Sequence, residues 1–487
     1  MAIDLETPEG QLFKLMARNL HERRTGRVGG RQWSRTVAAT VKIRPGLELL
    51  SDYRRGDPPL NKIHQGWADY VREFIRMGRL NIAGLTVSST RNRMDLRDFR
   101  TAAADDEQGD VAARDIMRHN GLKTKFRDLH DDLLTFGDAY TLTVPPGSGE
   151  KYAVITNEDP RAMITLDDPA TGRPKAGIKI FRDDYDAEDL AYLYLPDGKI
   201  RVARQKGRST LTNAPFRFDP KKWLFDDAKD LDIGRFPIVH YRNEGGHGEF
   251  EEHLDALDRI NDKIFNEWWI GKIQAFRQRA VKNLPDSDDD GKEIDYTDMF
   301  MASPDAMWQV PADVDFWEST PIDLNPIVVS IQKDLERYAA AVSQPLHTIT
   351  PDAANGSAEG ASLMREEHLY KIGDRIDRVD PGHAETMSLA FAFQGDTARS
   401  DRAQIEPIWG PTERFSLAQK ADGAAKLKDI LPQEAIWTDV LQYAPADVAR
   451  LRTLRGRDLI FLRGAGGAPA PDAPPAPAPT PPEPITP

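Results

Sequence analysis

The sequence of 487 residues contains no cysteine. Disulfide bonds, thiolate metal sites and cysteine nucleophiles are therefore excluded, and the absence fits a protein assembled in a reducing compartment. Long apolar runs are also missing, since none approaches the roughly 18 residues that a membrane-spanning helix needs. The first residues follow an amphipathic pattern and lack the apolar core of a secretory signal. We therefore expect neither a membrane segment nor a membrane partner.

Basic residues are outnumbered by acidic ones. The chain has 65 Lys and Arg against 78 Asp and Glu, which gives a formal net charge of −13. Proteins that hold nucleic acid tightly usually present a basic surface, because neutralising phosphates supplies most of the affinity. The charge balance argues against a tight DNA-binding protein. It is compatible with a protein that DNA slides past without adhering.

Two enzyme motifs are incomplete in this chain. A P-loop needs Gly, four residues and then Gly-Lys-Ser/Thr, but the three Gly-Lys pairs at 198–199, 271–272 and 291–292 precede Ile or Glu. The residues from Gly356 to Gly360 contain the letters of a nucleophile elbow in the wrong positions, without a preceding strand. A helix N-cap at Ser357 is the better interpretation. The chain is therefore not expected to be an ATP-driven motor or a serine hydrolase.

Metal sites are not favoured either. His240, His247 and His253 surround a Gly-rich turn at a spacing that fits no zinc-binding helix. A run of aspartates lacks the distal glutamate of a calcium loop and is typical of an exposed turn. These residues are Asp286, Asp288, Asp289 and Asp290. We expect no catalytic residue, no metal and no cofactor.

The first half of the chain predicts an α+β fold. Apolar residues recur at helical intervals over 62–80 and 124–136, and Gly137 ends the second of these helices. From there to about residue 239 the pattern changes to short strands, with a hairpin turn at Asp197 and Gly198. These signals predict helices that precede an antiparallel sheet.

The second half predicts three long helices. The first covers 251–284 and is stopped by Pro285, and a short strand-like stretch follows over 285–321. The second covers 325–343, with Pro326 in its first turn, where proline is favoured. A loop rich in Gly, Asn and Ser leads to the third, which starts at Ser357 and is periodic to Val379. The Pro- and Ala-rich tail, 464–487, predicts a flexible or polyproline-like extension.

Several motifs resemble a known family when they are read in order. They are DYRRGDPPL at 52–60, LLTFGDAYTLTV at 133–144, the segment 234–262 that contains RFPIVHYRNEGG, and the segment 342–369 that contains TPDAANGSAEGAS. Their succession resembles the portal proteins of long-tailed, siphovirus-type bacteriophages, the head-to-tail connector family, over roughly residues 50–450. One departure is Gly360, where the family often has alanine.

The resemblance implies a division of the chain into the parts of a portal subunit. It implies a phage portal fold with an α/β wing, long stem helices, a small mixed clip and a helical crown. The implied parts are the wing at 1–250, the stem helices at 251–284 and 322–345, the clip at 285–321, the tunnel loop at 346–357, the long wing or tunnel helix at 358–399, the helical crown at 400–463 and the disordered tail at 464–487.

Three sets of functional residues follow from this division. The tunnel loop, which would reach into the channel and touch DNA, contains no Lys or Arg between residues 348 and 357. Its residues are Thr350, Asp352, Ala353, Ala354, Asn355, Gly356 and Ser357. The clip residues that would dock the packaging motor and the adaptor are Met299, Phe300, Trp308, Phe316 and Trp317. Trp268 and Trp269 point about 100° apart on one helix, so one of them is expected at a subunit interface.

The implied function is a structural one without catalysis. The resemblance implies a ring, usually of twelve subunits, at one vertex of the virion capsid, through which double-stranded DNA is packaged and ejected. Its partners would be the large terminase subunit, the head-tail adaptor, and the major capsid and scaffolding proteins, with assembly in the host cytoplasm. Two alternatives stay open at this point. They are another head component, such as a minor head protein or adaptor, and a metal-dependent nuclease that uses carboxylates of residues 285–321.

Overall fold

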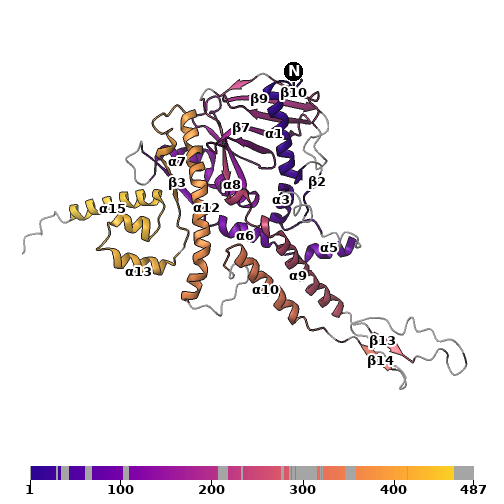
Figure 1. The fold of residues 1–487 in the computed structure, drawn as a ribbon. Coiled ribbons are helices and arrows are strands. Elements are labelled where there is room, and N and C mark those ends of the chain that lie inside the picture. Colours follow the sequence, from indigo (N-terminus) through magenta and orange to yellow (C-terminus); the bar gives the residue numbers. More distant parts are fainter. Residues whose placement is uncertain are drawn as a thin grey trace, which may run out of the picture.

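The computed structural model describes residues 2–28, 31–34, 43–60, 69–102, 109–206, 218–226, 228–231, 234–275, 279–283, 287, 291, 315–318, 320, 322–345, 358–413 and 415–465. Figure 1 shows a broad body of helices and sheets, a pair of helices that projects from it, and a helical segment at one side. We call the first part the body (residues 2–250 and 358–409), the second the stem pair (α9 and α10) and the third the C-terminal helical segment (residues 415–465).

Helices build one half of the body. Their bounds are α1 Pro8–Thr25, α3 Leu47–Arg55, α5 Asp69–Met77, α6 Ile82–Arg91, α7 Val111–Asn120 and α8 Leu122–Phe136. In α8 the predicted apolar stripe of Phe126, Leu129 and Leu133 is buried in the main core. Gly137 caps the helix in the left-handed region, at a φ of 83°. A side chain there would also collide with the carbonyl of Gly246, so the predicted helix-to-strand junction is confirmed and depends on glycine.

Antiparallel sheets build the other half. A three-stranded sheet has the order β12 (Ile238–Arg242), β4 (Asp138–Val144) and β5 (Val154–Glu158). A larger sheet has the order β10 (Trp223–Phe225), β9 (Lys199–Lys206), β8 (Glu188–Tyr194), β7 (Pro174–Asp183) and β6 (Met163–Asp167), and β11 (Lys229–Asp230) also pairs with β9. A short hairpin joins β1 (Arg27–Val28) to β2 (Arg31–Gln32). Together with the helices, these sheets confirm the predicted α+β class.

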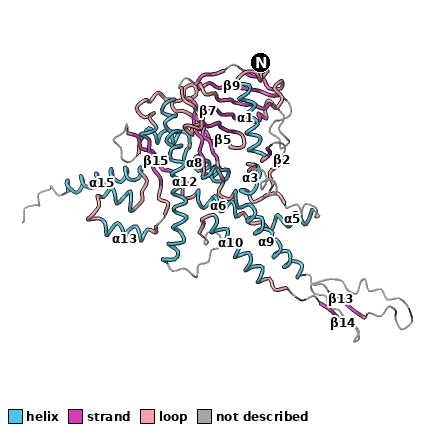
Figure 2. The backbone as a smooth tube through the Cα atoms, in the orientation of Figure 1, coloured by secondary structure: helices cyan, strands magenta, loops and turns pink. Residues whose placement is uncertain are grey.

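The larger sheet is covered by the first helix. Phe13, Met16 and Leu20 of α1 are buried against Ile178 and Leu193 of the sheet. The predicted hairpin turn at Asp197 and Gly198 joins β8 to β9, and Gly198 has the positive φ that such a turn requires. Figure 2 shows the strands gathered in the upper body, apart from one strand pair beyond the stem pair.

The stem pair corrects one prediction. After the short 3-10 turns η1 (Glu244–Gly246) and η2 (Glu251–His253), α9 runs over Leu254–Ala275, so the helix expected over 251–284 ends early. Residues Arg279–Lys282 form β13 instead, which pairs with β14 (Asp315–Glu318). The reason is where the facing helix α10 (Asn325–Ala341) begins. The Gln274 side chain, near the end of α9, donates a hydrogen bond to the carbonyl of Ile322, which comes shortly before the first residue of α10. Among the described residues no helix faces the chain beyond Ala275, so a longer α9 would leave its apolar side uncovered.

The third long helix, α12, covers Ala358–Phe393 and continues through Pro381 beyond the predicted periodicity. It crosses the face of the three-stranded sheet, where Gly382 leaves space for the ring of Tyr241. A Cβ at that position would lie 2.4 Å from the Tyr241 ring. The buried side chains Ile372, Val379 and Met387 join α12 to the main core. The middle of α12 is therefore a fixed part of the body.

The chain after α12 begins with strand structure rather than with a helix. After η3 (Arg402–Gln404), β15 (Ile405–Trp409) pairs with β3 (Leu96–Thr101). This strand interrupts the largely helical character expected for residues 400–463, because β15 pairs with the edge of β3 and buries Ile405. Helices follow as α13 (Leu417–Leu427), α14 (Gln433–Ala435), the π-turn η4 (Ile436–Val440) and α15 (Pro445–Ala465). The tail prediction concerns residues outside the described ones, except 464 and 465, which end α15.

Candidate functional site: the stem pair and the base of the 346–357 segment

An apolar seam joins the two helices of the stem pair to the body. Leu257 and Ile260 of α9 and Ile331, Leu335 and Tyr338 of α10 are all buried, and all belong to the main core cluster. The seam fixes the half of the stem pair that is nearest to the body. The stem pair is therefore an extension of the body core and not a separately folded hairpin.

A buried carboxylate also links the two helices. Only 2% of the Asp334 side chain on α10 is exposed. It accepts hydrogen bonds from Arg259 (3.0 Å) and Lys263 (2.7 Å) of α9, and from Arg337 (3.2 Å) of its own helix. The hydrogen bond from Lys263 is the main reason that the pKa of Asp334 falls to about 2. Asp334 is therefore ionised at neutral pH and connects α9 to α10 by charge-assisted bonds.

The two tryptophans expected at a subunit interface contact α5 within the same chain. The Phe74 ring of α5 lies 5.4 Å from the Trp268 ring and 6.3 Å from the Trp269 ring. Trp269 also stacks on Phe265 at 5.8 Å, and the Lys272 ammonium lies 4.3 Å from the Phe74 ring centre. Both tryptophans are partly exposed. Their contact with a neighbouring subunit stays a prediction.

The residues expected in the clip are described only in part. Phe316 and Trp317 lie on β14, in register with Val281 and Ala280 of β13. Trp317 is 49% exposed. Met299, Phe300 and Trp308 lie outside the described residues, as do the expected DNA-contact residues. These are Thr350, Asp352, Ala353, Ala354, Asn355, Gly356 and Ser357.

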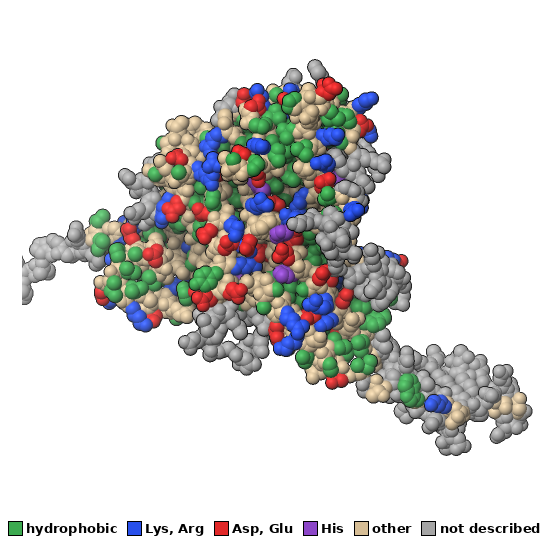
Figure 3. Space-filling model, in the orientation of Figure 1, with side chains coloured by type: hydrophobic (Ala, Val, Ile, Leu, Met, Phe, Trp, Pro, Cys, Tyr) green, Lys and Arg blue, Asp and Glu red, His purple; other side chains and the backbone are tan. Residues whose placement is uncertain are grey.

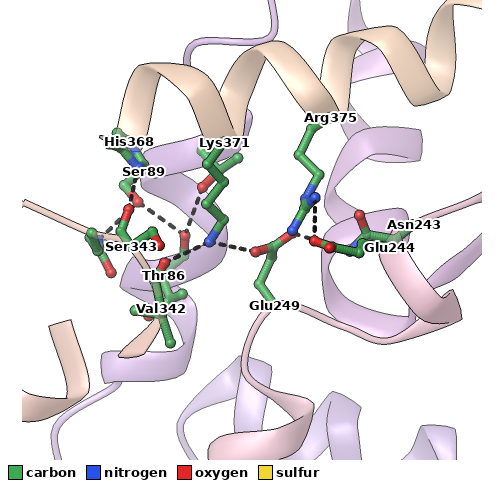
Figure 4. A network of polar contacts seen from close by, with 12 residues as sticks. Thr86, Ser89, Asn243, Glu244, Glu249, Val342, Ser343, His368, Lys371 and Arg375 are labelled. Atoms are coloured by element: carbon green, nitrogen blue, oxygen red, sulfur yellow. Dashed lines mark hydrogen bonds and ion pairs between the residues drawn. The ribbon is translucent and has the colours of Figure 1, made fainter. Parts of the chain in front are cut away.

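The residues just before the 346–357 segment are bonded to α12, the helix that follows the segment. At the end of α10, the carbonyl of Val342 accepts a hydrogen bond from Lys371 of α12 at 2.8 Å. The Ser343 hydroxyl donates to Glu367 at 2.9 Å, and the Ser343 carbonyl lies 3.0 Å from His368 Nδ1. Burial lowers the pKa of His368 to about 4, so a neutral imidazole donates its Nδ1 proton to this carbonyl. Figure 4 shows these contacts between the two helices.

Helix α6 also contacts the end of α10 and the residues that follow it. Gln344 donates a hydrogen bond to the Ser89 hydroxyl at 2.9 Å, and the Tyr338 and Thr86 hydroxyls lie 3.0 Å apart. Thr86 is buried and Ser89 is partly buried on α6. The residues that lead into the 346–357 segment are therefore held by two helices of the body.

An almost fully buried glutamate lies at the centre of this arrangement. Glu249, in the connection from β12 to α9, has a side chain that is 3% exposed. Its carboxylate lies 2.5 Å from the Lys371 ammonium and 2.7 Å from Arg375 Nε, and it accepts a hydrogen bond from Asn243 at 3.1 Å. Arg375 also contacts Glu244 at 3.0 Å. Burial alone would raise the pKa of Glu249, but the two cations outweigh it and lower the pKa. Figure 4 shows Glu249 between the two side chains of α12.

A cleft of about 630 Å³ adjoins this network. It lies between the connection to α9, the end of α10 and α12, and charged side chains of both signs line it. Sequence reasoning missed the network, although one signal was present. Lys371 and Arg375 are four residues apart and so share a helix face. Two cations on a helix face that also packs into a core require a carboxylate nearby, but periodicity does not identify which one.

His240, one of the three histidines considered as a metal site, is held by two carboxylates instead. His240 lies 3.0 Å from Asp138 and 2.9 Å from Asp167, and its ring stacks on Tyr140. Burial opposes the charged imidazole, but the two aspartates outweigh it and raise the pKa of His240 to about 9. A protonated imidazole has no lone pair for a metal. Within the described ranges, no group of three or more His, Cys, Asp or Glu side chains is arranged to hold a metal ion.

The comparisons with known proteins identify the family. A family model described as "Phage portal protein, SPP1 Gp6-like" matches residues 41–449. A solved chain from "Neck of empty GTA particle computed with C6 symmetry" is similar at 15% identity and a TM-score of 0.43, over 77% of this chain and 94% of that chain. A chain from "Neck of native GTA particle computed with C12 symmetry" gives 12% identity and a TM-score of 0.40, over 76% and 93%. The comparison with curated proteins gave no match.

Because the family match covers most of the chain, the chain belongs to the phage portal protein family, SPP1 Gp6-like. It is a portal protein of a phage-like head, which confirms the resemblance found in the sequence. Membership in this family implies a place at a capsid vertex and supports assembly as a homo-oligomeric ring. The family is structural rather than enzymatic. No helix among the described residues is long and apolar enough to cross a membrane. The assignment to long-tailed phages stays a prediction.

Proposed function

We propose that twelve copies of this chain close into a ring at one vertex of the capsid, and that double-stranded DNA enters and leaves the head through its centre. The observation that carries the proposal is the family match over residues 41–449. The stem pair supports it, because two packed helices that project from a broad body give every copy the same rod-like part to arrange around an axis.

The parts of the subunit follow from this proposal. The wing consists of residues 1–250 together with the helix of 358–399, the stem of 251–284 and 322–345, the clip of 285–321, the tunnel loop of 346–357 and the crown of 400–463. The strand pair beyond the stem pair supports the clip assignment through β14, which lies within 285–321, whereas β13 falls in the last residues of the 251–284 range (Figure 1). The half-exposed Trp317 is the kind of aromatic side chain that protein interfaces favour.

The tunnel loop has a chemistry suited to a passing polyanion. Residues 350–357 carry Asp352 as their one charged side chain, so a ring of them forms a weakly negative collar. DNA meets no cation there, and each ion pair to a phosphate would otherwise add a salt-dependent hold. The bonds from Lys371 and His368 to residues 342 and 343 support this role, since a loop that contacts moving DNA needs a fixed base.

The partners follow from the same assignment. The clip binds the large terminase subunit during packaging and the head-tail adaptor afterwards, while the wing contacts the major capsid and scaffolding proteins. Assembly takes place in the host cytoplasm. The portal has no catalytic step of its own in this account, and terminase supplies the ATP hydrolysis.

Heads assembled with and without this chain test the proposed function. The measured quantity is the DNA per head that survives nuclease treatment. Heads that contain the chain are expected to protect DNA when terminase and ATP are present, and heads that lack it are expected to protect none. Equal protection in both preparations would refute a role of this chain in genome entry.

A further inference from the structure

Two histidines lie together in the interior of the body. His130 on α8 is 1% exposed and His383 on α12 is 0% exposed. Their Nε2 atoms lie 2.9 Å apart, within hydrogen-bond distance. On the face drawn in Figure 3, Lys, Arg, Asp and Glu side chains are spread over the surface, where water solvates their charges. The two imidazoles have no such access to water, so a proton added to either ring introduces a charge into the interior.

The pair lies where several elements of the body meet. The Phe126 ring of α8 and the Tyr241 ring of β12 lie 4.4 Å and 5.2 Å from the His383 ring, centre to centre. The Trp409 ring of β15 lies 5.7 Å from the His130 ring and 5.6 Å from the His383 ring. The two histidines therefore join α12 to α8 at a place that β12 and β15 also enclose.

A chain of neutral hydroxyl groups continues from the pair. His383 Nδ1 lies 3.3 Å from the Tyr241 hydroxyl, which lies 2.8 Å from the Thr386 hydroxyl. Thr386 in turn lies 2.8 Å from the Thr141 hydroxyl of β4. Burial raises the pKa of Tyr241, so its phenol group stays neutral. Within the part of the chain that the structure describes, no carboxylate is hydrogen-bonded to either imidazole.

The charged groups on the surrounding elements give a protonated pair little support. Arg127 of α8 opposes a positive charge on His130. Carboxylates on α12 and β15 already have other partners. These are Asp380 with Trp409, Glu385 with Arg235, and Glu406 with Arg100.

Protonation of both rings is incompatible with this geometry. The contact needs one Nε2 that carries no proton, because two N–H groups cannot donate to each other. Burial lowers the pKa of His130 to about 3, although the backbone of Met94 favours the charged ring, and burial also lowers the pKa of His383 well below 6.5. Both histidines titrate near pH 6.5 in an unfolded chain. Below that pH the unfolded chain therefore binds protons that the folded chain excludes, and the folded state loses stability.

The elements that the pair joins share one core, and the large sheet has another. Val379 of α12 and Leu129 of α8 belong to the main core cluster. Phe13 of α1 and Ile178 of the large sheet belong to a separate cluster. Parts of a protein with separate cores can open independently. An opening of α12 can therefore leave the large sheet folded.

We propose that His130 and His383 form an acid-sensitive switch between α8 and α12. The switch is closed while both rings are neutral, and it opens when the rings take up protons, which releases the middle of α12 and β15 from the body. Lys371 and His368 of the same helix hold residues 342 and 343, so an opened α12 also frees the base of the 346–357 segment. This inference goes beyond the proposed function and does not depend on it.

Variants that cannot take up a proton test the switch. His130→Gln with His383→Gln keeps neutral hydrogen-bonding groups at both positions, and urea unfolding of the full chain is measured from pH 7.5 to 5. Below about pH 6.5, the folding equilibrium constant of the parent is expected to fall faster than that of the variant, by up to about a hundredfold per pH unit, because two protons are taken up. His119→Gln, at an exposed position of α7, is the matched control and is expected to keep the parental slope. Equal slopes in the parent and the double variant would overturn the inference.

The single variants keep the test decisive if the double variant does not fold. His130→Gln and His383→Gln are each expected to reduce the slope by about tenfold per pH unit, which corresponds to one proton. Parental slopes in both single variants would equally overturn the inference.

Hydrogen exchange of the parent locates the opening. Exchange rates at pH 5 and 7.5 are compared after correction for intrinsic exchange. Residues 379–391 and 405–409 are expected to lose protection by about tenfold or more at pH 5, while residues 174–206 of the large sheet keep theirs. An equal loss over the large sheet would mean that acid weakens the whole fold, and it would overturn the assignment of a switch at α12.

Discussion

Glu249 and Arg375 form an ion pair of 2.7 Å in which both side chains are less than 10% exposed. Glu249 precedes the first stem helix, and Arg375 lies on α12, which also holds the end of the second stem helix through Lys371. The pair therefore joins the body, both stem helices and the base of the 346–357 segment. Removing the pair is expected to lower the stability of the folded chain and, as a consequence, to impair DNA packaging.

Glu249→Gln should destabilise the folded chain by about 3–5 kcal/mol, the usual cost of removing one partner from a buried ion pair. The variant leaves the charges of Lys371 and Arg375 in a site where their side chains are 10% and 9% exposed. Urea unfolding followed by circular dichroism gives the free energy. Glu366→Gln, at an exposed position of α12, is the control and should change it by less than about 0.5 kcal/mol. Equal effects of the two variants would contradict the role of Glu249.

The stem pair should respond to acid through Asp334. Its pKa is lowered from 3.8 to about 2, so the Asp334 carboxyl group loses its proton more readily in the folded state than in the unfolded chain. The lowered pKa stabilises the folded state fully above about pH 4, and this stabilisation is lost as the pH falls through about 2. Asp334→Asn should therefore cost about 2 kcal/mol at pH 7. The difference in free energy of unfolding between Asp334→Asn and the parent should shrink towards zero as the pH falls from about 4 to about 2.

Urea midpoints measured over that pH range check this prediction. Glu336→Gln, on the same helix, removes a more exposed ion pair with Lys333. It should change the free energy of unfolding by less than about 0.5 kcal/mol at every pH. If the difference in free energy of unfolding between Asp334→Asn and the parent stays constant down to pH 2, the charge of Asp334 contributes nothing to the stability of the stem pair.

Trp268→Ala and Trp269→Ala should weaken ring closure while leaving the helix content near that of the parent. Both rings contact Phe74 within the chain and are partly exposed, so each has surface left for a neighbouring subunit. Light scattering after size exclusion gives the fraction of rings, and circular dichroism gives the helix content. If both variants form rings as stable as those of the parent, the two tryptophans serve only the packing of α5 on α9.

Asp352→Lys with Asn355→Lys should leave rings and heads intact but slow or stall packaging, with relief at higher salt. A cationic collar would hold the phosphates of DNA, and salt weakens that hold. Asp184→Lys with Tyr185→Lys is the control, because it changes the charge equally at an exposed turn of the body. The readout is nuclease-protected DNA per head at two salt concentrations. If the loop variant packages as much DNA as the parent at both salt concentrations, the loop does not lie in the path of the DNA.

Local signals were sufficient for much of this fold. The periodic stripe of α8 and the glycine that ends it predicted a helix-to-strand junction that the structure contains. Asp197 and Gly198 predicted the hairpin between β8 and β9. Each of these features is decided by residues that are close in sequence, where helix periodicity and turn chemistry are reliable guides.

The features that were missed depend on residues that are far apart in sequence. The strand at 279–282 exists because β14 pairs with it, and the strand at 405–409 exists because β3 offers an edge. Glu249 meets Lys371 and Arg375 across more than a hundred residues. Propensity and periodicity carry no information about such partners, so the sequence predicted a helix in place of the first strand and no ion network at all.

Electron microscopy of the purified parent chain is the decisive test of whether this protein forms a DNA channel. We expect closed rings with an open centre, in which every subunit contributes its stem pair around the axis. Twelvefold symmetry is expected when the rings are taken from assembled heads. A chain that stays monomeric, or that forms particles without a central opening, would contradict the assignment of this protein as a DNA channel.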